Sequence, residues 1–368
     1  MSVCTTKQRG ALALLSLASM AVGVTVWYTA TQMPPKVEMA RVMRMSLPEL
    51  QRDLGLKSTL SVLFDWRQKH GWALEAERML LALVCLFYDL CSTRFGQGGF
   101  YLVTSVVVPI MNMALIDAMK PAHSTLLGVL AVTFIYSLGQ LICIGAAVPL
   151  LYVPLYALVR ALDLERVFPT RAFASPTVPL LKVVSLLAGA LTIGSALVPT
   201  THRSWVWINI GFQLYPLLFL PLAPAYYLLP HRTQSAHSGT VADQYRENWI
   251  STAIFYWVGL AMIAPTVMQV VRGERIRIHD AELLILIDAC GAVASAALFT
   301  LIDCVADANL KPNPHAQCCT ATSVAKSLGM AVVVGPGCAF ADYLARREEA
   351  VADYHAGKQL SLIHISEP

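Results

Sequence analysis

The sequence predicts an all-α, polytopic transmembrane helix bundle that forms a single domain, and three observations carry that prediction. Of the 368 residues, 56% are hydrophobic and only 14% are charged, whereas soluble domains carry roughly 25% charged residues. Mean hydropathy is high, at +0.58. Apolar stretches fill most of the chain, and no long polar region divides it. In lipid a chain must satisfy its backbone hydrogen bonds internally, which helices do.

Individual spans follow from the apolar stretches, since a crossing requires about 20 mostly apolar residues. About nine crossings are expected, within a range of roughly eight to ten. Pro149 and Pro154 are expected to divide the uncharged stretch 124–159 into two helices or one sharply broken helix, and Gly96, Gly98 and Gly99 to form a turn. The expected spans are 10–32, 79–93, 100–119, 124–159, 178–197, 205–229, 249–271, 281–305 and 323–344.

The two ends of the chain and the first polar segment need separate interpretation. Residues 10–32 begin like a secretory signal, but their long apolar core favours a retained span. Residues 33–76 are rich in Lys and Arg, so the positive-inside rule predicts a cytosolic segment and an N-terminus on the other side. The helical bundle is assigned to residues 1–359. Residues 360–368 match the translation of a common sequencing-library adapter, and we expect them to be read-through rather than native protein.

Charge and motifs exclude several classes of function. The net charge of +4 comes without clustered Lys and Arg on a stable surface, so no nucleic-acid partner is expected. The nine cysteines show no metal-ligand spacing. Nucleophile elbows, phosphate-binding loops and zinc-protease motifs are absent from the sequence. We therefore expect no metal and no cofactor, and the expected partners are the lipid bilayer and a hydrophobic small molecule.

Aspartates within apolar stretches are the candidate catalytic groups, because ionisable residues at membrane depth are costly and usually functional. Asp288 is the sharpest candidate, since it lies well inside an apolar span. Desolvation favours the neutral acid there, which could donate a proton. Asp89 and Asp117 are further candidates, although each could instead form an ion pair at a helix end. Asp303 and Asp307 share a helix face but lack the second acidic motif that a magnesium-diphosphate site would need.

Neutral polar and aromatic side chains supply the candidate substrate-binding groups. Asn112, Gln140, Gln213, Tyr215 and Tyr256 lie at membrane depth. Such amides could orient an oxygen of a substrate or only tie helices together. The aromatic rings could stabilise a carbocation through their quadrupoles or only pack against neighbours.

Several short motifs resemble the polytopic fungal membrane-embedded terpene cyclases of indole-diterpene and meroterpenoid biosynthesis. The resemblance covers roughly residues 90–350. It rests on 95–101 (FGQGGFY), 117–121 (DAMKP), 154–158 (PLYAL), 212–216 (FQLYP), 335–337 (GPG) and 346–349 (RREE).

The resemblance implies an enzyme that protonates an olefin or epoxide of a prenylated aromatic, indole or meroterpenoid precursor and directs a cation cyclisation without metal. It also implies an integral protein of the endoplasmic reticulum membrane. Two alternatives remain at this point. A proton-coupled transporter could use the same aspartates as a relay, with broken helices around a midplane site. A structural membrane protein would have no cavity near Asp288.

Overall fold

The computed structural model describes residues 5–45, 49, 71–119, 125–162, 177–228, 241–274, 278–306 and 321–350. The described residues are 91% helical and contain no strand, which confirms the all-α prediction for this part of the chain. The proposed read-through 360–368 and most of the segment 46–70 lie outside the described residues.

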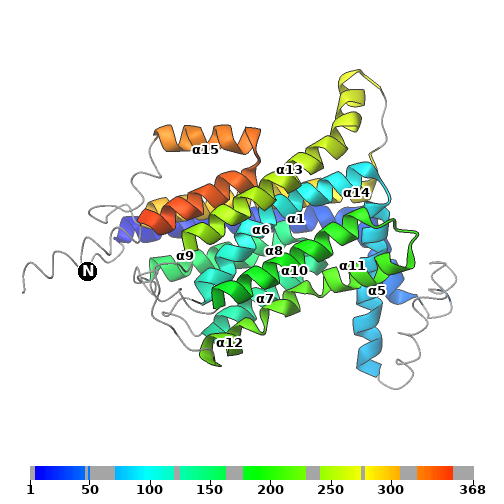
Figure 1. Cartoon of the computed structure of the whole chain (residues 1–368), viewed down its shortest axis with the longest axis horizontal. Coiled ribbons are helices and arrows are strands. Elements are labelled where there is room, and N and C mark those ends of the chain that lie inside the picture. The colour runs from blue at the N-terminus through cyan, green and yellow to red at the C-terminus, as the bar shows by residue number, and fades with distance from the viewer. Residues whose placement is uncertain are drawn as a thin grey trace, which may run out of the picture.

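Most helices run roughly along one common direction (Figure 1). The helices of the first half are α1 (Thr6–Gln32), α2 (Pro34–Arg44), α5 (Gly71–Cys91), α6 (Arg94–Ala118), α7 (Thr125–Ile142), α8 (Ile144–Ala147), η1 (Val148–Tyr152) and α9 (Val153–Ala161). The second half contains α10 (Thr177–Leu197), α11 (Arg203–Gln213), η3 (Tyr215–Phe219), α12 (Leu222–Leu228), α13 (Val241–Val271), α14 (Asp280–Ala306) and α15 (Ala321–Val333). A last helix follows over 336–350.

Six of the described helices are long and apolar enough to cross a membrane, or seven if the bent pair α11 and η3–α12 is one span. The expected total of about nine is therefore not confirmed. Three expected spans are shorter apolar helices: Met79–Cys91, Leu126–Ile142 and Val324–Val333. The first of these belongs to α5, which runs across one end of the bundle instead of along it (Figure 1).

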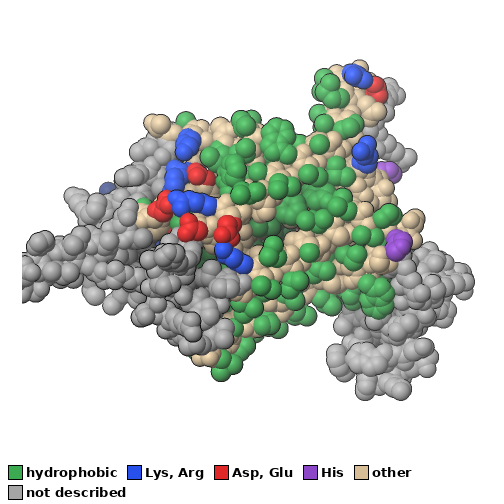
Figure 2. Space-filling view, in the orientation of Figure 1, with side chains coloured by type: hydrophobic (Ala, Val, Ile, Leu, Met, Phe, Trp, Pro, Cys, Tyr) green, Lys and Arg blue, Asp and Glu red, His purple; other side chains and the backbone are tan. Residues whose placement is uncertain are grey.

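Hydrophobic side chains dominate the middle of the face seen in Figure 2, whereas Lys, Arg, Asp and Glu gather near one end of it. Outward-facing leucines and isoleucines such as Leu14, Leu186 and Ile254 are more than half exposed. A water-soluble protein would rarely leave so large an apolar surface uncovered. The architecture is thus compatible with an integral membrane protein.

The glycines at 96, 98 and 99 do not form the expected turn, because α6 already begins at Arg94. Gly98 packs against α13, where an added Cβ would lie 2.8 Å from the carbonyl oxygen of Gly259. Gly99 similarly faces Ile285 of α14. Small residues allow helices to approach closely, which is how apolar helices gain packing energy in lipid. The glycine-rich stretch therefore fixes how α6, α13 and α14 pack.

Replacing Gly98 with alanine is expected to destabilise the fold by about 1–3 kcal/mol, the usual cost of overpacking. The new methyl group would meet Ile263 at 2.7 Å and the Gly259 carbonyl at 2.8 Å. Gly329→Ala is the matched control, because nothing lies within 4 Å of that position and alanine is the better helix former. Thermal unfolding in detergent should show a lower midpoint for the first variant only. Equal midpoints would contradict this account of the α6–α13 contact.

The chain breaks at Cys143, not at Pro149 or Pro154 as the sequence suggested. Cys143 has φ +82°, the only positive φ of a non-glycine residue in the described ranges. Residues 144–161 then continue as one helical span with a π-turn, η1, over Val148–Tyr152. In a π-turn the carbonyl of residue 149 would accept from the N–H of residue 154, but Pro154 has no N–H. The hydroxyl of Ser19 on α1 donates to the carbonyl of Pro149 instead, at 2.5 Å. Both prolines are therefore accommodated within the helix.

Helix α1 is an integral part of the bundle. It packs against α14, α9 and η1. Its inner face is formed by buried residues such as Leu12, Ser19 and Ala30. Whether residues 10–32 are retained or removed stays a prediction.

Candidate functional site

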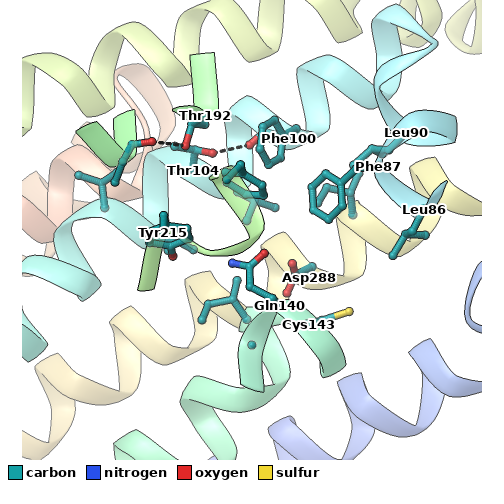
Figure 3. Close-up of a pocket in the computed structure, with 18 of the residues that line it drawn as sticks. Leu86, Phe87, Leu90, Phe100, Thr104, Gln140, Cys143, Thr192, Tyr215 and Asp288 are labelled. Atoms are coloured by element: carbon teal, nitrogen blue, oxygen red, sulfur yellow. Dashed lines mark hydrogen bonds between the residues drawn. The ribbon is translucent and has the colours of Figure 1, made fainter. Parts of the chain in front are cut away.

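A cavity of about 930 Å³, including the space at its open side, lies between α5, α6, α7, α10, α11 and α14. The part of this space that the centre of a water-sized molecule can occupy is about 100 Å³. The carbon-rich part of its wall includes Leu86, Leu90, Val103, Val107, Val108, Met111, Ile144, Ala188, Leu284 and Ile285. Side chains from helices far apart in the sequence converge on it (Figure 3). The cavity overturns the expectation attached to a purely structural protein, that no cavity would exist near Asp288.

Asp288 is the only carboxyl group among the residues that line this cavity. It lies on α14 and is 8% exposed. Its Oδ1 accepts a hydrogen bond from the backbone N–H of Gly145 at 2.5 Å. Gly145 and Gly291 allow the close approach of α8 and α14 that this bond requires. Asp288 thus caps the first turn of α8 from another helix, satisfying an N–H that has no partner within that helix.

The other end of the helix break is also satisfied by a charged group. The ammonium of Lys36 donates to the carbonyl oxygen of Leu141 in the last turn of α7, at 2.5 Å. Lys36 lines the same cavity as Asp288 and Cys143. A cation at a helix C-terminus and an acid at a helix N-terminus both match the helix dipoles. The broken helix therefore presents two oppositely charged ends to one cavity.

Four aromatic rings form a continuous part of the cavity wall. The centroids of Phe87, Phe100 and Phe212 lie 5.0 to 5.5 Å apart, and Tyr215 stacks on Phe212 at 5.7 Å. All four residues line the cavity. Phe212 and Tyr215 are brought there by the bend after Gln213, where α11 ends and η3 begins. The face of an aromatic ring attracts a positive charge that lies within about 6 Å of its centroid.

Two of the expected substrate-binding residues lie in the cavity wall. Gln140 and Tyr215 both line it, and the Gln140 side chain interacts with the Tyr215 phenol. Both are labelled around the same space as Asp288 in Figure 3. Asn112 lies directly behind the wall, where its Oδ1 accepts from the hydroxyl of the lining residue Ser185 at 2.9 Å.

The remaining two lie elsewhere. Gln213 is buried and does not line the cavity; its amide donates to Oδ1 of Asn209 at 3.4 Å. The hydroxyl of Tyr256 donates to the carbonyl of Val332 at 3.1 Å, on an exposed part of α13. Both side chains tie helices or helix turns together in this structure, as the alternative interpretation allowed.

Asp89 is exposed near the end of α5, a helix-end position that the alternative interpretation allowed. It lines a separate surface depression together with Glu38, His279 and Asp280. The Arg41 guanidinium hydrogen-bonds Glu38, at 2.7 Å from Nε, and lowers the pKa of that carboxyl. This depression and the cavity share Ala281 in their walls. Asp89 therefore lies outside the cavity that contains Asp288.

Asp117 belongs to a buried ionic network at the opposite end of the bundle. Its centre is Arg347, whose guanidinium lies 3.2 Å from Asp303, 2.7 Å from Glu348 and 3.7 Å from Asp117. Tyr156 and Tyr343 donate to the two oxygens of Asp303, and Arg160 lies 3.7 Å from the same carboxylate. We refer to these seven residues as the ionic network: Asp117, Tyr156, Arg160, Asp303, Tyr343, Arg347 and Glu348.

The three candidate aspartates thus do not converge on one site. Only Asp288 lies in the cavity, and no member of the ionic network lines it. Sequence reasoning missed Lys36, Phe87, Phe100, Cys143 and Ser185. Phe100 lies within the quoted motif 95–101, and Phe87 lies two residues before the candidate Asp89, so aromatic residues close to features already singled out were the available signal.

The described residues contain no group of three or more His, Cys, Asp or Glu side chains that could hold a metal ion. Asp307, the second residue of the weak acidic pair, lies outside the described ranges. No protein-family model, curated protein or solved structure matches this chain.

Proposed function

We propose that this protein is a membrane-embedded terpene cyclase that starts a cation cyclisation by protonating a prenyl chain. One observation carries the proposal: the single carboxyl group of the described cavity lies in a space walled by carbon and by four aromatic rings. Cyclisation by protonation requires an acid, exclusion of water and walls that stabilise cations. The motif resemblance to fungal terpene cyclases agrees with this chemistry.

The geometry at Asp288 suits a proton donor. Gly145 holds Oδ1, whereas Oδ2 has no hydrogen-bond partner among the described residues. In the neutral acid, Oδ2–H would give its proton to a terminal alkene carbon or to an epoxide oxygen. The resulting cation would be attacked by the next alkene along the chain, forming a ring bond. Loss of a proton from the carbon beside the final cation would form the product alkene and restore the acid.

The aromatic wall provides the second requirement of the reaction. A migrating positive charge would pass the ring faces of Phe87, Phe100, Phe212 and Tyr215, which attract cations most strongly where water is excluded. The substrate would be a hydrophobic prenylated molecule that reaches the cavity from the bilayer. We place the protein in the endoplasmic reticulum membrane on the basis of the resemblance.

The deciding assay is expression in a fungal host that is fed prenylated aromatic or indole precursors, each as the plain olefin and as the terminal epoxide. A new cyclised product isomeric with one precursor is expected by mass spectrometry. Asp89→Asn is the matched control, because that carboxyl is exposed and lies outside the cavity. Absence of a new product for every precursor, with the protein present in membranes, would argue against the proposal.

A proton-coupled transporter is the second candidate, and the break at Cys143 favours it. Transporters place half-helix ends at a midplane site, and here Lys36 and Asp288 satisfy two such ends at one cavity. Transport requires, however, that the cavity be reached from both faces of the membrane. The ionic network lies at the opposite end of the bundle, and none of its residues lines the described cavity. Proteoliposomes with an internal pH dye separate the candidates: substrate-dependent proton flux would favour the transporter, and unchanged flux the cyclase.

A further inference from the structure

The hydroxyl of Ser185 differs from the other aliphatic hydroxyls in the cavity wall. Thr104 and Thr192 donate their protons to carbonyls of their own helices, to Phe100 and Ala188, each at 2.8 Å. That is the ordinary state of Ser and Thr in apolar helices. Ser185 instead donates across to α6, to Oδ1 of Asn112, at 2.9 Å. Because its single proton is used there, the oxygen of Ser185 offers only lone pairs to the cavity.

Asn112 is a fully buried amide that is only half satisfied. It is 0% exposed, and its Nδ2 has no hydrogen-bond partner in the described structure. An unpaired buried polar group costs stability and is uncommon unless it serves a function. Here the amide fixes the direction of the Ser185 proton, away from the cavity. Asn112 is therefore a positioning residue, and Ser185 is the group that a ligand would contact.

Ser185 and Asp288 lie at different levels of the cavity. The distance between their levels can be measured along α6, because Gly99 of α6 faces Ile285 near Asp288, and Asn112 of α6 contacts Ser185. Helices α6 and α14 run in the same direction, as the contacts of Thr93 with Glu282 and of Gly99 with Ile285 show. Asp288 is therefore close to the level of residue 102, roughly 15 Å from Asn112 at 1.5 Å per residue. Apolar and aromatic side chains form the wall between them.

We propose that Ser185, positioned by Asn112, binds the hydrogen-bond donor of a ligand that has an O–H or N–H head group and a long apolar chain. The chain lies along the aromatic wall with its far end at Asp288. The position of the far end rests on the proposed function, whereas the recognition of a donor at Ser185 does not. The ligand class is thus an amphiphile with a donor head, such as a prenyl alcohol, a prenylated phenol or a prenylated indole.

Two probes test the head-group recognition directly: farnesol, and its methyl ether, which has the same chain and no donor. Their affinities for the purified protein in detergent are measured by ligand titration with native mass spectrometry. The wild-type protein is expected to bind farnesol about tenfold more tightly than the ether, the scale of one hydrogen bond in a dry site. In Ser185→Ala this ratio should fall to about one, mainly through weaker farnesol binding.

Thr192→Val is the matched control, since it removes a hydroxyl from the same wall and the same helix whose proton is used within α10. It should keep the wild-type ratio. Thermal unfolding of each variant verifies that it is folded. A ratio unchanged in Ser185→Ala, or the same loss in Thr192→Val, would overturn the proposal. So would wild-type protein that binds both probes equally or neither of them.

The outcome is separable from that of the cyclase assay, because binding is measured without turnover. A Ser185-dependent ratio without any cyclised product would support the head-group site and contradict the proposed function. A cyclised product with a ratio that ignores Ser185 would support the proposed function and overturn the head-group site.

Discussion

Asp288→Asn is expected to lower product formation by at least about 100-fold, the lower end of what general acid catalysis contributes. Asparagine keeps the size of the side chain and an oxygen that can accept from the N–H of Gly145. It has no acidic proton to give to an alkene or epoxide. The measurement is product per amount of protein in the membrane fraction, with the host assay described above.

A second substitution separates the chemical role of Asp288 from its role as a helix cap. Asp288→Ala removes the proton and also the acceptor for Gly145, so it should lose product and about 1 kcal/mol of stability, the usual cost of losing a helix cap. Asp288→Asn should lose product with little change in thermal unfolding. Activity retained by Asp288→Asn would remove Asp288 from the role of acid, whatever its effect on stability.

Arg347→Met is expected to destabilise the protein by about 3–5 kcal/mol, the cost of breaking a buried ion pair by removing one partner. The Arg347 side chain is 5% exposed and lies within 4 Å of Asp303, Glu348 and Asp117. Without its guanidinium, these three buried acids would lose the cation that they share, and Arg160 contacts only the carboxylate of Asp303 among the described ion pairs. The loss should appear as a much lower midpoint of thermal unfolding in detergent.

Arg246→Met is the matched control for this effect. The Arg246 side chain is 56% exposed and contacts Asp243 and Glu349. Exposed ion pairs contribute little, so this variant should remain within about 1 kcal/mol of wild type. Similar midpoints for the two variants would contradict the account of the ionic network as a buried support of the last helix, 336–350.

Much of the secondary structure could be predicted from composition and hydropathy alone. The low charge content and the long apolar stretches predicted an all-helical chain, and the described residues are helical throughout the bundle. Asp288, Gln140 and Tyr215, three of the candidate residues, line one cavity, and their roles there stay predictions. This part succeeds because helix formation in an apolar stretch, and the cost of burying a carboxyl group there, are local properties.

The places where prediction failed depend on contacts between distant segments. Pro149 and Pro154 looked like helix breaks, but the hydroxyl of Ser19 and a π-turn accommodate the backbone around them. Asp89 and Asp117 have apolar neighbours much as Asp288 does, yet one is exposed and the other lies in the ionic network. The local sequence favoured Asp288 as the most deeply placed of the three and allowed a helix-end ion pair for Asp117, but it could not say which carboxyl group meets a cavity.

The sequence by itself determined that this chain folds into apolar helices with a few acids inside them. The tertiary structure decided which of those acids meets a cavity, and that Phe87, Phe100, Lys36 and Ser185 share it. The physical reason lies in helix rotation and spacing, which hydropathy does not specify. Close contacts such as Gly98 with Gly259, and Gly145 with Gly291, set both. They join segments more than 140 residues apart, so they exist only in the folded bundle.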